Sequence, residues 1–180
     1  MSLNSLKQLL PGCFLINPQW SKDSRGEFIK TFQNSEYQSL GINFDIHEEF
    51  YSVSQANVIR GMHFQMPPHD HEKMVYCTSG AVLDVLLDLR KENYGKVACA
   101  EISKNNRHII YIPRGVAHGF LSLEDNTVMI YKTSTEHVPT HDRGIKWDSF
   151  GFNWKLTATP ILSNRDRDGL VNFDTFISPF

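Results

Sequence analysis

The stretch Pro113-Arg-Gly-Val-Ala-His-Gly-Phe-Leu-Ser-Leu123 carries the pattern Pro-x-Gly-x-x-His directly before an apolar run. It follows residues 108–112, which are rich in the branched and aromatic side chains that favour strands. Pro113 and Gly115 are turn-forming residue types, so they mark a break between two strands. The sequence therefore predicts a strand at 108–112, a tight turn, and a second strand at 119–123.

Short runs of the same character continue in both directions from this stretch. We predict strands at residues 12–16, 26–32, 44–54, 57–65, 72–77, 81–89, 97–102, 108–112, 119–123 and 127–133. Turn sequences such as Ser79-Gly80 and Asn93-Tyr94-Gly95 separate them. The best helix candidate is short, at 34–40, and Gly41 ends it. Many short strands at this spacing are typical of an all-β sandwich or barrel.

The size and charge of the chain limit its organisation and its partners. Its 180 residues fit one domain, 1–180, with 1–55 as an N-terminal strand extension and 140–180 as an irregular C-terminal cap. A net charge of −2 gives no basic field for nucleic acid or an anionic membrane. Three scattered cysteines disfavour both a disulfide framework and a thiolate zinc site. The apolar run at 9–16 is short and broken, which favours a cytoplasmic protein without a signal peptide or membrane span.

The pattern at 113–118 resembles the second motif of the cupins, in which the histidine points into a β-barrel. The first cupin motif usually supplies two histidines and a carboxylate seven positions before a glycine. Here that glycine is Gly80, and the position seven before it is Lys73. A cation at a ligand position disfavours a bound metal, so we expect none. The alternative is a metal-binding cupin that uses His69, His71 and His118, because the first two have His-x-His spacing.

The segment Asn57-Val-Ile-Arg-Gly-Met-His-Phe-Gln65 puts polar side chains on a strand that is otherwise apolar. Alternation places Gly61, His63 and Gln65 on one face of this strand. Arg60 then points to the other face. It can share a cavity with His63 only if Gly61 forms a bulge or lies at a twisted strand end. Taken alone, His63 could equally be a hydrogen-bonded histidine of the interior.

Five segments of the chain form a combined signature. They are Arg60-Gly-Met-His-Phe-Gln65, Pro113-Arg-Gly-Val-Ala-His-Gly-Phe120, Tyr131-Lys-Thr133, Gly144-Ile-Lys-Trp147 and Leu162-Ser-Asn-Arg-Asp166. Together, in this order and at similar spacings, they resemble the dTDP-4-dehydrorhamnose 3,5-epimerase family, from about Asp23 to about Asp166. The resemblance implies a cupin-type double-stranded β-helix, a jelly-roll barrel with short peripheral helices. It also implies a cofactor-free isomerase that inverts C3 and/or C5 of a nucleotide-diphosphate-linked 4-keto-6-deoxy sugar.

The resemblance gives each matched position an expected role. His63 matches the catalytic base, Tyr131 the proton donor, and Asp166 the carboxylate that supports the histidine. The expected substrate-binding residues are Arg25, Arg60, Gln65, Lys73, His118, Asp142 and Arg165. Lys73 could instead be a solvated charge at the rim, and Asp166 could merely cap the C-terminal segment. The family also implies a homodimer whose N-terminal strands contribute to the neighbouring subunit's sheet and site.

The expected reaction explains why these residue types are needed. A ketone at C4 acidifies the hydrogens on C3 and C5, because removal of either gives an enolate. Inversion needs a base on one face, an acid on the other, and positive charge or hydrogen-bond donors at the developing oxyanion. His63 can supply the base, Tyr131 the acid and Lys73 the charge.

Several positions depart from the family pattern, and they concern nucleotide recognition. The family usually has Gln-Asp-Asn where this chain has Glu48-Glu49-Phe50, and it often has a glutamate at Lys30. It has an aromatic residue that stacks on the base at Glu136. The nucleotide could therefore differ from thymidine. The alternatives on this scaffold are a single-site 3-epimerase, a 3,4-ketoisomerase, and a sugar-binding module without activity.

Overall fold

Strands dominate the computed structural model, which describes residues 5–180. The strands are β1 (Ser5–Leu10), β2 (Cys13–Asn17), β3 (Gln19–Asp23), β4 (Gly26–Lys30), β5 (Glu48–Ser54), β6 (Ile59–Gln65), β7 (Lys73–Ser79), β8 (Ala81–Asp88), β9 (Val97–Ser103), β10 (Ile109–Ile112), β11 (Val116–Ser122), β12 (Thr127–Thr133) and β13 (Asp142–Gly144). The helices are α1 (Asn34–Ser39), η1 (Lys91–Asn93), α2 (Asn164–Asp168) and η2 (Phe173–Thr175). The predicted all-β class with short peripheral helices is confirmed.

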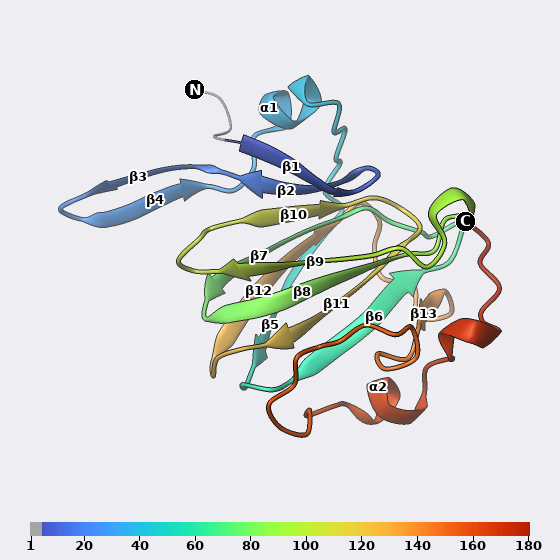
Figure 1. Ribbon diagram of the computed structural model, residues 1–180. Coiled ribbons are helices and arrows are strands. Elements are labelled where there is room, and N and C mark those ends of the chain that lie inside the picture. The colour runs from blue at the N-terminus through green and yellow to red at the C-terminus, as the bar shows by residue number, and fades with distance from the viewer. Residues whose placement is uncertain (1–4) are drawn as a thin grey trace.

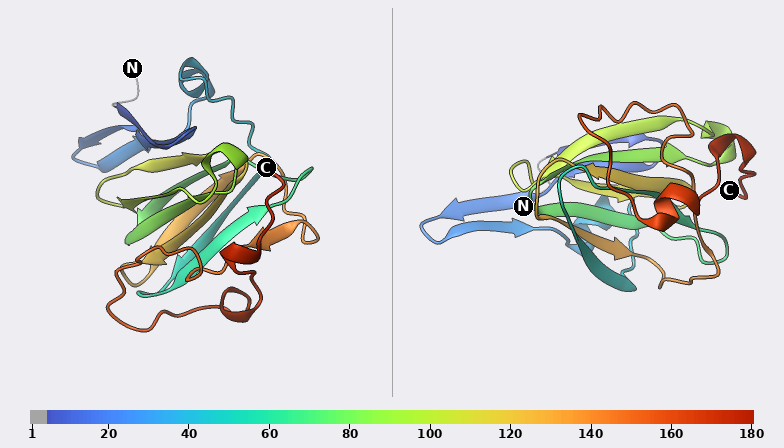
Figure 2. Two further views of the ribbon diagram at one scale, coloured as in Figure 1. Left: turned by 45° about the vertical axis from the view of Figure 1, so that its right-hand side comes forward. Right: turned by 90° about the horizontal axis from the view of Figure 1, so that it is seen from below.

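Two antiparallel sheets face each other and form the barrel (Figure 1). The six-stranded sheet has the order β1-β2-β10-β7-β12-β5, and the five-stranded sheet has the order β13-β6-β11-β8-β9. This is the jelly-roll arrangement that the cupin resemblance implied. Among residues 5–180, β3 and β4 form a two-stranded sheet of their own, and this hairpin projects away from the barrel, as both views in Figure 2 show.

The space between the sheets holds an apolar core. Leu86 and Phe120 of the five-stranded sheet belong to the same buried cluster as Val75 and Tyr131 of the six-stranded sheet. Alternation along β7 puts Lys73 on the same inner face as Val75, so the strand that supplies core residues also supplies the cation.

Each sheet is also covered on its outer face. The segment around α1 packs Tyr37 and Phe44 against Met74 of the six-stranded sheet. On the other side, aromatic residues of the C-terminal segment, including the buried Trp154, pack against the five-stranded sheet. The expected cap at 140–180 thus includes aromatic residues that cover the outer face of the five-stranded sheet. It also includes α2, which lies beside β6.

Three strands lie outside the predicted ranges, and one starts earlier than predicted. β1 lacks β-branched and aromatic residues, β3 is mostly polar, and β13 has only three residues, so none carries a strong local strand signal. These strands form because partners pair with them: β2 pairs with β1, β4 with β3 and β6 with β13. β11 begins at Val116 rather than at residue 119, which places His118 on the strand itself.

A bulge at Gly61 resolves the orientation of Arg60. His118 pairs with His63 and Phe120 with Arg60, so β6 contains one residue more than β11 across this interval. Gly61 has a φ of +143°, and a Cβ there would lie 2.4 Å from the Cα of Gly119. The extra residue lets Arg60 and His63 line one cavity while Met62 is buried in the outer cluster.

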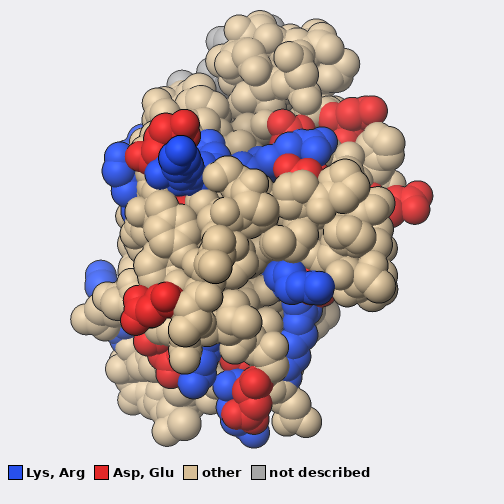
Figure 3. Space-filling model, turned by 90° about the vertical axis from the view of Figure 1, so that its right-hand side faces the viewer, with Lys and Arg blue, Asp and Glu red and all other residues tan. Residues whose placement is uncertain are grey.

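Charge is mixed over the face drawn in Figure 3, where Lys and Arg lie among Asp and Glu with no large area of one sign. This pattern fits the net charge of −2. Within residues 5–180, no helix has the length and apolar character needed to cross a membrane.

Candidate active site

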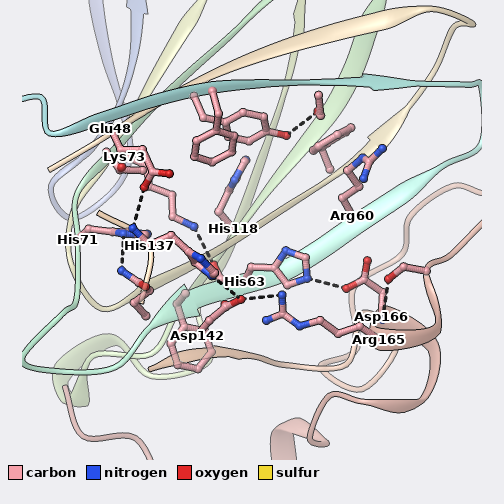
Figure 4. Close-up of a pocket in the computed structure, with 18 residues that line it drawn as sticks. Glu48, Arg60, His63, His71, Lys73, His118, His137, Asp142, Arg165 and Asp166 are labelled. Carbon is pink, nitrogen blue, oxygen red and sulfur yellow. Dashed lines mark hydrogen bonds and ion pairs between the residues drawn. The ribbon is translucent and has the colours of Figure 1, made fainter. Parts of the chain in front are cut away.

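A pocket of about 540 Å³ opens between the two sheets (Figure 4). Nine of the ten residues that the sequence singled out line it: Arg60, His63, Gln65, Lys73, His118, Tyr131, Asp142, Arg165 and Asp166. They come from β6, β7, β11, β12, β13 and α2, so residues far apart in the sequence meet in one cavity. Arg60 lies at one end of the view in Figure 4, and Glu48, His71 and His137 gather at the other.

His63 and Asp166 form a hydrogen-bonded pair. His63 Nε2 lies 2.6 Å from Asp166 Oδ1, and the Asp166 side chain is buried. Ser163 caps α2 by accepting a hydrogen bond from the Asp166 backbone N–H, at 3.0 Å. The Asp166 carboxylate therefore contacts the histidine and leaves capping to the serine. Since Nε2 faces the carboxylate, Nδ1 is the ring nitrogen left to accept a proton.

Tyr131 reaches the pocket from the opposite sheet. Its hydroxyl lies 3.2 Å from Ser52 Oγ, and its ring stacks on that of Phe50, with 4.8 Å between centroids. Burial raises the pKa of Tyr131 above its usual range, although the Ser52 hydrogen bond acts in the other direction. The phenol therefore keeps its proton at neutral pH.

Lys73 is buried in the pocket wall. Only 9% of the residue is exposed, and its Nζ donates a hydrogen bond to the His63 carbonyl oxygen at 3.1 Å. Burial lowers the pKa of Lys73 to about 8, while the nearby charges of Asp142 and Asp84 act to raise it. The alternative of a solvated rim charge is therefore wrong.

His118 belongs to a second histidine–carboxylate pair. Its Nε2 lies 2.7 Å from Oδ2 of Asp84, which is fully buried. Burial raises the pKa of Asp84, while His118 acts to lower it. Asp84 was not among the site residues expected from the sequence. One feature of the sequence could have marked it: Asp84 is the only acidic residue in the apolar run 81–87, and it lies on the same strand face as Val82 and Leu86.

A charged network lines the wall beside β13. Arg165 Nη1 lies 2.8 Å from Asp142 Oδ2, and His137 Nε2 lies 3.2 Å from the same oxygen. Burial acts to raise the pKa of Asp142, but the hydrogen bonds from Arg165 and His137 outweigh it, and the pKa is lowered. His137 was not among the expected site residues either, because no local sequence pattern marks it.

His137, rather than Glu136, is the side chain of its loop that lines the pocket. Glu136, the position at which the family is expected to carry a stacking aromatic, is not among the residues that line the pocket. The Glu136 carbonyl accepts a hydrogen bond from Gln65 Nε2 at 3.2 Å, which directs the backbone of Glu136 at the pocket wall. The backbone N–H of His137 donates to Glu48 Oε2 at 2.7 Å.

Arg60 and Gln65 are both held by protein atoms. Arg60 Nε donates to Ser54 Oγ at 3.1 Å, and its Nη2 donates to the Val53 carbonyl at 3.2 Å. Gln65 Nε2 donates to the His69 carbonyl, and Gln65 Oε1 accepts from the Val138 N–H. Arg60 therefore has further guanidinium donors to offer a ligand, whereas Gln65 ties together the loops that shape the pocket.

Arg25 is the one expected site residue that lies outside this pocket. It follows β3 at the tip of the projecting hairpin, its side chain is 89% exposed, and it pairs with Asp23 at 2.6 Å. The hairpin extends away from the barrel that it belongs to (Figure 2). Arg25 therefore cannot contact a ligand in the pocket of its own chain.

The three histidines of the metal alternative have other partners. His69 packs against the ring of His141, His71 Nδ1 lies 3.1 Å from Gln65 Nε2, and His118 bonds Asp84. Across residues 5–180, no group of three or more His, Cys, Asp or Glu side chains is arranged to hold a metal ion. These histidines do not form a ligand set.

Comparison with known proteins adds sequence relatives. A family model described as dTDP-4-dehydrorhamnose 3,5-epimerase matches residues 7–172. The chain is 38% identical over 157 residues to the dTDP-4-dehydrorhamnose 3,5-epimerase of Sinorhizobium fredii. The aligned residues cover 84% of this chain and 80% of the Sinorhizobium enzyme. It is 32% identical over 182 residues to the enzyme of the same name from Shigella flexneri, with 97% and 100% covered.

Solved structures agree with these relatives. The rmlC epimerase of Mycobacterium tuberculosis superposes with a TM-score of 0.91 at 33% identity, covering 94% of this chain and 88% of that one. The epimerase RmlC of Legionella pneumophila, solved in complex with dTDP-4-keto-L-rhamnose, has a TM-score of 0.91 at 27% identity, with 96% and 94% covered. The fold, the pocket and the relatives agree: this chain belongs to the dTDP-4-dehydrorhamnose 3,5-epimerase family.

Proposed function

We propose that the protein inverts C3, C5 or both carbons of a nucleotide-diphosphate-linked 4-keto-6-deoxy sugar, with His63 as base and Tyr131 as acid. One observation carries the proposal: an imidazole backed by a carboxylate and a protonated phenol reach one pocket from opposite sheets. The names of the relatives support the reaction class, and the Legionella complex supports a dTDP-linked keto sugar as ligand.

The first step is removal of a proton from carbon. Nδ1 of His63 takes the proton, and the Asp166 carboxylate stabilises the imidazolium that results. Electron density moves from the broken C–H bond to the C4 oxygen, which becomes an enolate oxygen. The buried Lys73 ammonium and the His118 ring line the same pocket and are placed to stabilise this charge.

The second step is protonation from the other face. Tyr131 gives its phenolic proton to the same carbon, the C4 ketone re-forms, and the configuration is inverted. Ser52 Oγ then stabilises the phenolate through the hydrogen bond seen at 3.2 Å. Both groups regain their starting protonation from solvent, and a second inversion repeats these steps at the other carbon.

The remaining cations suit the diphosphate. Arg60 has guanidinium N–H groups that make no hydrogen bond to the described residues 5–180. Arg165 likewise has guanidinium N–H groups beyond the nitrogen that pairs with Asp142. Arg25 would serve only in a neighbouring subunit's pocket, so its expected role rests on the predicted homodimer. The homodimer, the cytoplasmic location and the single domain spanning 1–180 stay predictions.

The test is solvent-deuterium incorporation followed by NMR, with dTDP-4-keto-6-deoxyglucose and no added metal. Exchange and inversion at C3 and C5 support the double epimerase, and exchange at C3 alone supports the single-site alternative. Migration of the carbonyl would indicate a 3,4-ketoisomerase, and binding without exchange a sugar-binding module. His63→Ala should lose exchange, whereas Tyr131→Phe should retain exchange and lose inversion.

The nucleotide is tested separately by a thermal-shift panel of dTDP-, CDP-, GDP- and UDP-linked sugars. A ligand that binds only the folded state raises the melting temperature, and at equal ligand concentration the shift is larger for the ligand with the lower Kd. The largest shift identifies the preferred nucleotide. This readout is independent of turnover, so it separates a wrong nucleotide from a wrong reaction.

A further inference from the structure

The inner face of the edge strand β5 is built around the side chains of the proposed chemistry. Alternation turns Glu48, Phe50 and Ser52 toward the pocket, and all three line it. The next residue on that face, Ser54, accepts a hydrogen bond from Arg60 Nε. This strand therefore contacts both Tyr131, the proposed acid, and Arg60, which is proposed to bind the diphosphate.

Phe50 and Ser52 hold Tyr131 at two points. Phe50 pairs directly with Tyr131 across β5 and β12, and their rings stack with centroids 4.8 Å apart and planes inclined by 12°. Ser52 Oγ lies 3.2 Å from the Tyr131 hydroxyl. The stacked ring limits rotation of the phenol about its Cα–Cβ bond, and the hydroxyl contact fixes its tip.

Phe50 also shields the tyrosine from solvent. Phe50 is 45% exposed, whereas Tyr131, directly beneath it, is 8% exposed. Tyr131 also lies near the His118 ring, with 6.2 Å between the ring centroids and 65° between the ring planes. Removal of the Phe50 ring would leave one face of the phenol open to water and free to tilt.

We propose that Phe50 is a positioning residue, which acts through Tyr131 and holds the phenol where it protonates the enolate before His63 can return its proton. This inference rests on the proposed role of Tyr131. The enolate has two fates: a proton from Tyr131 gives inversion, and a proton returned from His63 gives exchange with retention once His63 has exchanged with solvent. The orientation of the phenol sets the ratio between the two.

The experiment compares Phe50→Ala with the unmodified chain in deuterated buffer, with inversion and exchange followed by NMR. We expect exchange to change little and inversion to fall about ten- to a hundredfold, the scale expected when a catalytic group is misplaced by about 1 Å. Phe50→Tyr keeps a stacked ring and should restore the ratio. A purely structural role would lower exchange and inversion together.

Tyr51→Ala is the matched control. Tyr51 is the next residue on β5, is 67% exposed and lies on the outward face, so its loss should leave the ratio unchanged. If Phe50→Ala does not fold, as judged by its melting curve, Phe50→Leu removes the ring with less loss of bulk and is read in the same way. An inversion-to-exchange ratio equal to that of the unmodified chain would overturn the inference.

Tyr131→Phe separates the inference from the function on which it rests. If Tyr131→Phe inverts normally, the proposed acid is wrong and the role of Phe50 falls with it. If Tyr131→Phe loses inversion while Phe50→Ala keeps the normal ratio, the acid stands and only the positioning role is wrong.

Discussion

Asp166 Oδ1 lies 2.6 Å from His63 Nε2, although 103 residues separate the two in the sequence. The contact joins the five-stranded sheet to a short helix of the C-terminal segment. It fixes which ring nitrogen faces the pocket, because the nitrogen held by a carboxylate cannot also accept the substrate proton. The C-terminal segment is therefore part of the proposed catalytic machinery as well as a cover for the sheet.

Asp166→Asn should lower turnover by about a hundred- to ten-thousandfold, as expected when a catalytic base loses the carboxylate that orients it. An asparagine amide can donate to Nε2, which would put the ring proton on Nδ1 and remove the base. Exchange and inversion should therefore fall together, as measured by NMR in deuterated buffer. Asp168→Asn removes an exposed carboxylate from the same helix and should leave both rates near normal. Equal losses in the two variants would contradict the role of Asp166.

Turnover should fall as pH rises above about 8, because burial lowers the pKa of Lys73 to about 8. Above that pH the amine is neutral and no longer stabilises the enolate, so the rate should fall by up to about tenfold per pH unit. Lys73→Arg stays charged and should keep its own ratio of turnover at pH 9 to pH 7 close to one. The measurement is a pH profile of kcat/KM, which reports the pKa values of the free enzyme. An unchanged alkaline decline in Lys73→Arg would assign it to another group.

Asp142→Asn should move that alkaline decline to lower pH. The Asp142 charge acts to raise the pKa of Lys73, and Arg165 acts to lower it. Loss of the carboxylate removes the first effect and leaves the second, so the ammonium should deprotonate earlier. A decline that stays at the same pH, or moves upward, would show that Asp142 does not influence Lys73.

Local patterns predicted most of the barrel. Branched and aromatic residues marked β2 and β4 to β12, since in a strand with one buried face the buried side chains recur at every second position. The short helix before Gly41 was also predicted, at 34–40 against the observed α1. Strands without that pattern, such as β13, form because a partner strand lies beside them, and a single segment does not record its partner.

The site residues also fall into those that a local sequence pattern marks and those that only contacts in the fold reveal. Residues within recognisable motifs, such as His63, His118 and Tyr131, could be placed in the pocket from the sequence. Asp84 and His137 could not, because neither lies within a motif and their roles depend on contacts with side chains 34 and 5 positions away. Arg25 was expected in the site from the family resemblance alone, yet the hairpin carries it out of its own pocket.

Gly61→Ala should destabilise the fold by about 1–3 kcal/mol or more, the range for a strained backbone position. The φ of +143° disfavours any side chain, and a Cβ would lie 2.4 Å from the Gly119 Cα, which is backbone and cannot rotate away. Gly26→Ala is the matched control, with a φ of +123° and no atom within 4 Å of the added Cβ. Urea unfolding should show a larger loss for Gly61→Ala. Similar losses in both variants would mean that the close approach to Gly119 contributes little.

The folded state should lose stability as the pH falls below about 6.5, in part because of His71. Burial and the nearby Lys73 charge lower the pKa of His71 from 6.5 to about 2, so below pH 6.5 the unfolded chain binds a proton that the folded chain does not. This linkage costs up to about 1.4 kcal/mol per pH unit. His71→Asn keeps an acceptor for Gln65 Nε2 and should flatten the decline in the free energy of unfolding, measured with urea between pH 4 and pH 7. His47→Asn, which removes an exposed histidine, should retain the decline. The same slope in both variants would mean that His71 is not the group responsible.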